Sequence, residues 1–300
     1  MSIYPGAVRL TVRHDGVDAV VHDGGVENGP PIVLLHGTGG RVETHFFTVY
    51  PMLASRHRVI GIDLPAASST GEALSVEELA AHVWAVIEER ARGQRVALVG
   101  YSLGSSVAAV AAATRPADVD SLVLLNGWVQ TDNALRLRFE LWQQLYSRGL
   151  RDELARFMLM SVYSRSYLDS IPYVGPRPWA QVEQMLDDYS VGPGSEQQVR
   201  VNAAMDLTRV LPRITARTLV IGSIDDQYIP FVHSKELFGA ISAASLAAIG
   251  GGHGSVTERP AEVFHLVDRF VRDPAAYPAG SIVGDDSVLQ LAALRQEQSA

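Results

Sequence analysis

Residues Val96–Gly104 have the sequence VALVGYSLG, and this stretch decides the fold. The four apolar residues before Gly100 predict a buried strand, because a short apolar run that ends at a turn is typical of one. The ten residues from Ser105 to Thr114 are rich in Ala and Val and predict a helix. A Gly-x-Ser-x-Gly turn between a strand and a helix projects its serine, here Ser102, as a candidate nucleophile.

The two glycines of this turn permit its tight geometry. The positions that flank the serine come close to each other and to the strand, so a Cβ at Gly100 or Gly104 would clash. The turn holds the Oγ of Ser102 clear of the backbone, at the mouth of a pocket. The alternative is a surface serine between two strand-end glycines, but the strand before and the helix after favour a working nucleophile.

The composition is that of a large globular domain. The chain has 300 residues, 47% hydrophobic and 19% charged, which is enough to bury a large core as one domain or as one domain with an insertion. The net charge of −8 argues against nucleic acid or an anionic membrane as the main partner, and ordinary solubility explains it more simply. The absence of cysteine excludes disulfides, a thiol nucleophile and a cysteine-bound metal.

The sequence also bears on location. The first six residues, MSIYPG, lack the basic region and apolar run of a secretion signal. No apolar run comes near the length of about eighteen residues that a membrane span requires. We therefore expect a cytoplasmic protein, with no membrane contact, that acts on a small molecule. The sequence leaves its oligomeric state open.

Strands and helices alternate along most of the chain. This alternation predicts a parallel sheet with helices on both faces, preceded by a hairpin whose turn is His14-Asp15-Gly16. After Asp273 comes a tail with a short helix expected over 287–295, to which we assign no role. Strands are expected at residues 8–13, 17–22, 32–35, 59–65, 96–99, 121–126, 218–222 and 245–249, and helices at 75–92, 105–114 and 260–271.

The alternation breaks after Gly127. From there to about Arg213 only helical patterns occur, so residues 128–213 are expected to form a helical lid, with 1–127 and 214–300 as the core. Most of the large apolar side chains of this block would build its own interior, and about a quarter would face a pocket. Trp128 is the one that we expect to contact substrate. The expected lid helices are 134–146, 151–163, 179–189 and 195–210.

A serine hydroxyl needs a base to take its proton, and the base expected is a histidine oriented by a carboxylate. His253 lies in the stretch GGGHGSVTERP, residues 250–260, where a glycine-rich loop after the last strand lets the imidazole reach the serine. The alternative is a loop histidine held by the backbone. The histidines elsewhere, His45 among them, lack such a setting and are expected in solvent or satisfied in the core.

The carboxylate is expected after an earlier strand, and the stretch IGSIDDQYIP at residues 221–230 supplies Asp225 and Asp226. Only one of two adjacent side chains can point at the histidine, and we prefer Asp226, four residues before Pro230. The other would be a solvated turn residue or would accept backbone N–H groups. The resulting order along the chain is serine, aspartate, histidine.

Attack on a carbonyl places negative charge on its oxygen, and two backbone N–H donors stabilise that charge. One donor is expected from Leu103, directly after the serine. The other is expected from the loop HGTGG at residues 36–40, where we prefer Thr38 and keep Gly39 as the alternative. A phosphate-binding loop is disfavoured here, because no lysine or further glycine spacing follows.

Taken together, these motifs resemble the α/β-hydrolase superfamily over about residues 8–272. The resemblance implies an eight-stranded, mostly parallel sheet with a helical cap between the sixth and seventh strands, where the helical block lies. The motifs that carry the resemblance are His36-Gly37, Gly100–Gly104, the aspartate pair before Pro230, and Gly252-His253 with Glu258 and Pro260.

The chain departs from the family pattern in two places. Residues 63–69, DLPAASS, stand where relatives often have a Gly-x-Gly loop, so the loop beside the pocket would be shaped differently. Ser105 replaces a glycine that is common in relatives, which loosens any assignment to a subfamily.

The function that we expect is serine hydrolysis of a carboxylic ester or thioester of a small, partly apolar substrate, without metal or organic cofactor. Ser102 would attack with His253 as base, and water activated by His253 would then release the acid from the acyl-enzyme. A serine at this position argues against relatives with an aspartate nucleophile, such as epoxide hydrolases and haloalkane dehalogenases. The same residues could carry acyl transfer, carbon–carbon bond hydrolysis or a lyase or cyclisation step. Outside enzymes, the alternative is a ligand-binding member of the fold.

Overall fold

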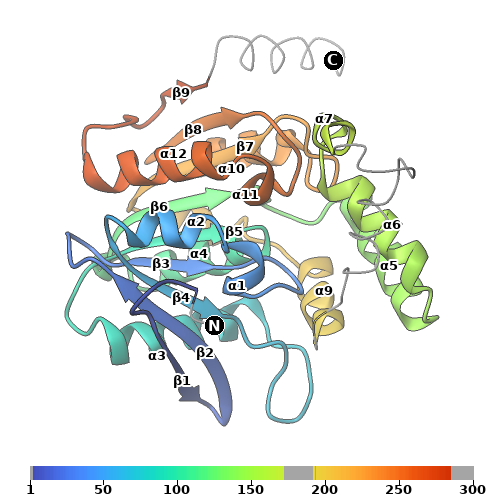
Figure 1. Ribbon diagram of the computed structural model, residues 1–300, viewed down its shortest axis with the longest axis horizontal. Helices are drawn as coiled ribbons and strands as arrows, with labels where there is room; N and C mark the ends of the chain where they lie inside the picture. Colours follow the sequence, from blue (N-terminus) through green and yellow to red (C-terminus); the bar gives the residue numbers. More distant parts are fainter. Residues whose placement is uncertain (1–2, 172–191, 193, 285–300) are drawn as a thin grey trace.

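The computed structural model of the chain describes residues 3–171, 192 and 194–284. In this part of the chain, nine strands form one sheet (Figure 1). The strands are β1 (Val8–His14), β2 (Val17–Gly25), β3 (Ile32–Leu35), β4 (Arg58–Asp63), β5 (Val96–Tyr101), β6 (Val119–Leu125), β7 (Arg217–Ser223), β8 (Ala244–Ile249) and β9 (Ile282–Val283). Their order in the sheet is β1-β2-β4-β3-β5-β6-β7-β8-β9.

The sheet is mostly parallel, as expected. Strand β2 runs antiparallel to β1 and β4, and the pairs from β4 to β9 are parallel. Every residue of β3, β5 and β8 is buried, because helices cover both faces of a parallel sheet and its strands are then apolar throughout. The carboxyl ends of β3, β5, β7 and β8 therefore meet at one edge of the sheet, where the loops that follow them come together.

Two hydrophobic clusters, one on each face of the sheet, form the core. Helices α3, α4 and α10 pack in one cluster, and α1, α2 and α12 in the other. The helices outside the segment between β6 and β7 are α1 (Val42–His45), α2 (Val49–Ala54), α3 (Val76–Arg90), α4 (Leu103–Thr114), α10 (Phe231–Ala240), α11 (Ser255–Glu258) and α12 (Pro260–Arg272). Short 3-10 helices lie at Pro116–Asp118 and Leu211–Arg213.

Local capping explains where α3 begins. The Ser75 hydroxyl accepts the Glu78 N–H at 3.2 Å, and the Glu78 carboxylate accepts the Ser75 N–H at 2.7 Å. This reciprocal pair satisfies two N–H groups that the first turn of a helix leaves without partners. The helix then ends at Arg90, two residues before the predicted limit of Arg92.

Among the described residues the sheet has nine strands, one more than the eight that the family resemblance implied. The additional strand β9 has two residues and runs parallel to β8, opposite Leu246 and Ala247. Two residues carry no alternating pattern, so the sequence contains no signal for this strand. The tail helix expected over 287–295 lies outside the described residues.

A helical segment separates β6 from β7. It contains α5 (Asn133–Ser147), α6 (Arg151–Val162), α7 (Arg165–Ser170) and α9 (Ser195–Ala203). Figure 1 shows these helices gathered beyond the carboxyl ends of the parallel strands. The helix expected over 179–189 lies outside the described residues.

The helix predicted over 195–210 is too long by seven residues, because α9 ends at Ala203. Beyond it the chain pairs with the segment that follows β6. Asp206 forms an isolated antiparallel bridge with Gln130, and the Leu207 N–H donates to the Val129 carbonyl at 2.8 Å. Tertiary backbone pairing thus ends a helix whose side-chain pattern continues.

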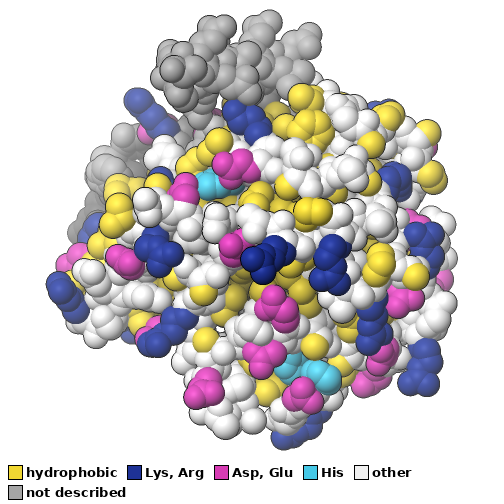
Figure 2. Space-filling model, turned by 180° about the vertical axis from the view of Figure 1, so that it is seen from behind, with side chains coloured by type: hydrophobic (Ala, Val, Ile, Leu, Met, Phe, Trp, Pro, Cys, Tyr) yellow, Lys and Arg dark blue, Asp and Glu magenta, His cyan; other side chains and the backbone are white. Residues whose placement is uncertain are grey.

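Within the described ranges, no helix combines the length and the apolar character that crossing a membrane requires. The surface carries charges of both signs. Figure 2 shows Lys and Arg interspersed with Asp and Glu across one face of the molecule.

Candidate active site

The serine turn has the strained geometry that its sequence predicts. Ser102 lies between β5 and α4 with φ 55° and ψ −121°. A Cβ on Gly100 would overlap the carbonyl of Gly104, and a Cβ on Gly104 would overlap the carbonyl of Leu35. Glycine is therefore required on both sides of the serine, and the second glycine also lets α4 approach the end of β3.

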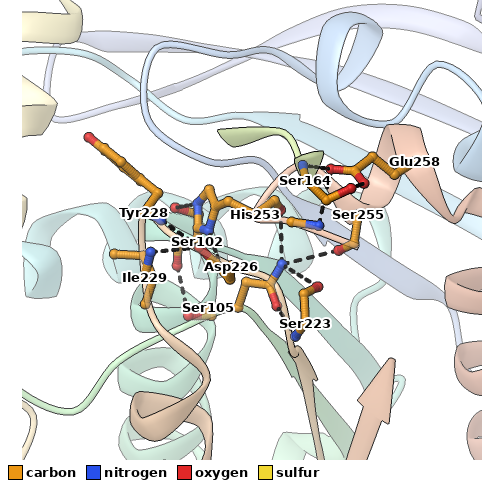
Figure 3. A network of polar contacts seen from close by, with 12 residues as sticks. Ser102, Ser105, Ser164, Ser223, Asp226, Tyr228, Ile229, His253, Ser255 and Glu258 are labelled. Carbon is orange, nitrogen blue, oxygen red and sulfur yellow. Dashed lines mark hydrogen bonds and ion pairs between the residues drawn. The ribbon is translucent and has the colours of Figure 1, made fainter. Parts of the chain in front are cut away.

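The structure brings Ser102, Asp226 and His253 together (Figure 3). The Nε2 atom of His253 lies 3.0 Å from the Oγ of Ser102, and its Nδ1 atom lies 2.7 Å from the Oδ2 of Asp226. The exposed fractions are 5% for the serine, 6% for the aspartate and 3% for the histidine. These side chains follow β5, β7 and β8, so parallel strands deliver them to the same edge of the sheet.

Of the two adjacent aspartates, Asp226 is the one at the histidine. Its second oxygen, Oδ1, accepts the backbone N–H groups of Tyr228 at 2.9 Å and Ile229 at 2.7 Å. A carboxylate with both oxygens engaged is fixed in orientation, which leaves Oδ2 directed at His253. Asp225 is partly exposed, and its N–H donates to the Gly251 carbonyl at 3.1 Å.

Two tyrosine rings flank the imidazole. The ring centroids of Tyr101 and Tyr228 each lie 5.3 Å from that of His253. Burial raises the pKa of Tyr101 well above its ordinary value, so its phenol stays neutral. Tyr228 also contacts the rings of Phe139 and Phe157, which belong to the helical segment. The aromatic residue two positions after Asp226 is the only sequence signal for this packing.

Asn126, which was not among the predicted site residues, holds the backbone of the histidine loop by hydrogen bonds. It follows β6 with φ 49° and is buried. Its Nδ2 lies 2.9 Å from the His253 carbonyl and 3.1 Å from the hydroxyls of Ser223 and Ser255. Its Oδ1 accepts the Ser223 N–H at 2.9 Å. A polar residue that ends the apolar run of β6 was the available signal.

The loop that carries His253 is also bound to the helical segment (Figure 3). The carboxylate of Glu258 accepts the Gly252 N–H at 3.1 Å, the Ser164 N–H at 2.9 Å and the Ser164 hydroxyl at 2.6 Å. The Gly254 N–H donates to the Val162 carbonyl at 2.9 Å. The histidine loop is therefore held between its own strand and the connection from α6 to α7.

The loop after β3 lies against the serine. A Cβ on Gly37 would be 3.0 Å from the Cβ of Ser102. The Leu103 N–H, in the first turn of α4, donates no hydrogen bond within the described residues. It is therefore available to an oxygen bound next to Ser102.

The backbone N–H groups of that loop differ in their partners. The Gly37 N–H donates to the Nδ1 of His45 at 3.1 Å, and the Gly39 N–H donates to the Oε1 of Gln198 at 2.8 Å. The Thr38 N–H donates no hydrogen bond to any residue that the structure describes. Thr38 is thus the member of the pair Thr38 and Gly39 whose N–H is available.

His45 is partly exposed, and its ring packs beside the loop after β3. Its ring packs edge-on against Tyr101 with centroids 5.3 Å apart, and Gly40 leaves the space that this ring fills. Burial, together with a smaller effect of the neighbouring imidazoles of His36 and His253, lowers the pKa of His45 to about 3. The ring is therefore neutral at pH 7, which is the form in which Nδ1 can accept a hydrogen bond.

Trp128 has no exposed surface in the structure. Its indole N–H donates to the Thr131 hydroxyl at 2.9 Å, and its ring lies against Phe139 with centroids 6.1 Å apart. These contacts pack the indole against Phe139 of α5. They give no support to the expectation that Trp128 contacts substrate.

No group of three or more His, Cys, Asp or Glu side chains is arranged to hold a metal ion in the described parts of the chain. His36, close to the site, uses both ring nitrogens, with Nδ1 2.7 Å from the Gly37 carbonyl and Nε2 accepting the Leu64 N–H at 2.8 Å. Burial lowers the pKa of His36, so it stays neutral. In the described parts of the chain, His253 is the histidine whose ring lies within hydrogen-bond distance of the Ser102 hydroxyl.

Comparison with known proteins identifies the family of the chain. A sequence model described as "Alpha/beta hydrolase family" matches residues 32–266. The chain is 32% identical over 247 residues to pyrrolizixenacetamide deacetylase of Xenorhabdus hominickii, a match that covers 81% of this chain and 91% of that protein.

Solved structures share the fold at lower identity. The crystal structure of MGS-M2, an alpha/beta hydrolase enzyme from a Medee basin deep-sea metagenome library, superposes with a TM-score of 0.76 at 21% identity and covers 88% of this chain and 98% of its own. A thermophilic esterase from Thermogutta terrifontis superposes with a TM-score of 0.72 at 20% identity, covering 89% and 98%. From its family match and its similarity to the deacetylase, the chain belongs to the alpha/beta hydrolase family.

Proposed function

We propose that this hydrolase cleaves a carboxylic ester or thioester of a small, partly apolar substrate through an acyl-enzyme on Ser102. The observation that carries the proposal is the continuous contact from the Ser102 hydroxyl through His253 to Asp226, at 3.0 and 2.7 Å. The rings of Tyr101 and Tyr228 beside the imidazole support a partly apolar substrate.

In the first step, the Oγ of Ser102 attacks the substrate carbonyl and its proton moves to the Nε2 of His253. The imidazole becomes positively charged in this step. The ionised carboxylate of Asp226 stabilises that charge and keeps the proton of the neutral ring on Nδ1. Backbone N–H groups of Tyr228 and Ile229 hold the carboxylate, so no reorganisation is needed when the charge develops.

The carbonyl oxygen becomes an oxyanion as the new bond forms. The backbone N–H groups of Leu103 and Thr38 are the donors that we assign to it. Two donors fixed in a buried site stabilise such a charge strongly, and the loss of one costs about 10²–10³-fold in kcat. Helices α5, α6, α7 and α9 act in this proposal as the cap that excludes bulk water.

The leaving alcohol or thiol takes the proton from the Nε2 of His253, which leaves Ser102 acylated. Water then enters, and the same nitrogen takes its proton while the hydroxide oxygen attacks the acyl carbonyl. Collapse of the second intermediate returns the proton to the serine and releases the acid.

A second candidate is hydrolysis of an N-acyl bond. The deacetylase of Xenorhabdus hominickii, at 32% identity, favours it. The chemistry uses the same three side chains, but the leaving amine must receive the proton from His253 before the bond breaks. Matched esters and amides of the same short acyl group distinguish the two candidates by their kcat/KM.

The test uses a fluorophosphonate probe and p-nitrophenyl esters of short acids. We expect the probe to label Ser102, and we expect Ser102→Ala to abolish labelling and to lower kcat by about 10⁴-fold or more. Asp226→Asn should lower kcat by about 10⁴-fold, because the amide supports the wrong imidazole tautomer. Asp225→Asn, the same change one residue earlier, is the matched control and should retain activity within about tenfold.

Two outcomes would overturn the proposal. Turnover that persists in Ser102→Ala excludes the acyl-enzyme on that residue. Labelling of Ser102 without turnover of any ester, thioester or amide excludes hydrolysis of these substrates and favours acyl transfer, carbon–carbon bond cleavage or a lyase step at the same residues.

A further inference from the structure

Four consecutive residues with backbone N–H groups follow His36 in the loop after β3. Three of these N–H groups donate a hydrogen bond. Gly37 donates to His45 at 3.1 Å, Gly39 donates to Gln198 at 2.8 Å, and the Gly40 N–H turns back to the Gly37 carbonyl at 3.2 Å. Among the described residues, only the Thr38 N–H in this run has no acceptor. Thr38 is only partly buried, so its N–H is open to a ligand atom bound beside the loop.

The side chain that occupies Gly39 comes from the helical segment. Gln198 lies on α9 and is buried, and its Oε1 accepts the Gly39 N–H across 159 residues of sequence. Its Nε2 lies 3.5 Å from the carbonyls of Leu64 and Pro65, in the loop after β4. One amide therefore bridges two loops at the carboxyl edge of the sheet.

A second amide of α9 fixes the neighbouring side chain. The Nδ2 of Asn202 donates to the Oγ1 of Thr38 at 2.8 Å, and the Asn202 carbonyl accepts the Thr131 hydroxyl at 2.5 Å. Asn202 is buried. The loop after β3 is thus held by α1 of the core on one side and by α9 on the other.

We propose that Gln198 is a positioning residue for oxyanion stabilisation. Its Oε1 accepts the Gly39 N–H and thereby fixes the loop. The Thr38 N–H then remains available to donate to the substrate oxygen. Oxyanion stabilisation then depends on the packing of α9 against the core. This inference rests on the function proposed above.

The physical reason is that stabilisation by a preorganised donor depends strongly on the donor's position. A backbone N–H stabilises the transition state only if it already points at the developing charge. A displacement of about 1 Å of such a group costs about 10²-fold in rate. Without the acceptor on Gln198, the partly buried Gly39 N–H would lose its partner, and the loop would no longer be fixed against α9.

The test compares Gln198→Met and Gln198→Glu with Gln197→Met. Methionine keeps the length of the side chain and removes the acceptor, so we expect Gln198→Met to lower kcat about 10- to 100-fold with KM nearly unchanged. Glutamate restores an oxygen for the Gly39 N–H, although its other oxygen meets the Leu64 and Pro65 carbonyls, so Gln198→Glu should recover part of the loss. Gln197, the preceding residue of α9, makes no side-chain hydrogen bond to the described residues and is the matched control.

A boronic acid inhibitor forms a tetrahedral adduct on serine. Its inhibition constant reports on oxyanion stabilisation and would not change through a general loss of protein stability. In Gln198→Met its inhibition constant should rise in parallel with the fall in kcat, while that of a planar competitive inhibitor stays constant. Equal kcat in Gln198→Met and wild type, equal losses in Gln197→Met, or no recovery in Gln198→Glu would each overturn the inference while Ser102 remains the nucleophile. Turnover that persists in Ser102→Ala would overturn the proposed function, and this inference with it.

Discussion

At Ser102, the backbone adopts a strained conformation that destabilises the folded state. A φ of 55° with ψ −121° is rarely adopted by residues with a Cβ, and such conformations cost about 1–3 kcal/mol. Glycine relieves this strain but loses about 0.5–1 kcal/mol through the entropy of the unfolded chain. We therefore expect Ser102→Gly to be more stable than Ser102→Ala by about 1 kcal/mol, since both lack the hydroxyl and only alanine keeps the strain.

Urea denaturation of the two inactive variants measures this difference. The alanine variant is the control for the lost contact with His253, because both variants lose it equally. Equal stabilities, or a more stable alanine variant, would mean that the turn stores no strain at this residue.

The residues of the site differ in how far the sequence reveals them. The meeting of Ser102, Asp226 and His253 at hydrogen-bond distance could be predicted, because each stands in a local pattern of glycines or turn residues after a buried strand. Gln198 could not be found in this way. Its contact with Gly39 spans 159 residues, and nothing in the sequence of α9 distinguishes it from Gln197.

Among the elements, the histidine loop and the α6–α7 connection form one hydrogen-bonded unit. The Glu258 carboxylate accepts three hydrogen bonds, two of them from Ser164. In Glu258→Gln, an amide NH2 replaces one carboxylate oxygen, so the hydrogen bond that the Ser164 hydroxyl donates to a charged acceptor is lost. We expect the free energy of unfolding to fall by about 1–3 kcal/mol. We also expect kcat to fall, because Gly252 precedes His253.

Chemical denaturation and ester turnover, measured on the same variant, check this prediction. The control is Glu153→Gln, the same substitution on the exposed surface of α6, where the Glu153 side chain makes no hydrogen bond with the described residues. Unchanged stability in Glu258→Gln would show that the carboxylate is replaceable at this junction. Equal losses in both variants would assign the effect to net charge.

Element boundaries show where sequence patterns stop being informative. The strands with continuous apolar runs and the capped helix α3 were predicted because their signals are local. Helix α10 was not predicted, since Phe231, Val232 and Leu237 do not share one face, and Val232 stays exposed at 47%. Helix α9 ends early because its continuation pairs with residues next to β6. In both cases tertiary contacts determine the element.

At the scale of the whole molecule, the site is assembled from both parts of the chain. Ser102, Asp226 and His253 follow strands of the sheet, and the helical segment holds the loops on either side of them through Ser164 and Gln198. The sequence predicted that a helical block would lie between β6 and β7. It could not predict that this block contributes hydrogen bonds to both loops, because such contacts exist only once the two parts have packed.

Buried histidines make the stability of the whole molecule depend on pH. Burial lowers the pKa of His45 to about 3, while a histidine in the unfolded chain titrates near its ordinary value of 6.5. Between these values the unfolded state binds the proton and the folded state does not, so the free energy of unfolding falls as the pH falls from 6.5 toward 3. Hydrogen bonds and cations also lower the pKa values of Asp23, Asp63 and Asp268 against the opposing effect of their burial, so these carboxylates add to the loss only at more acidic pH.

Between pH 6.5 and 5, the histidines therefore dominate the change in the free energy of unfolding. His45→Asn tests how much of this change comes from His45. The asparagine oxygen can accept the Gly37 N–H in place of Nδ1, but it takes up no proton. Over this range we expect the free energy of unfolding to fall less in the variant than in the wild type, by a difference of at most about 2 kcal/mol. Urea denaturation at each pH measures this difference. The exposed His265 provides the control, since His265→Asn should leave the slope unchanged. A slope in His45→Asn equal to that of the wild type would mean that the folded protein accommodates a charged imidazole at this position, and that His45 does not have to stay neutral to hold the loop beside Ser102.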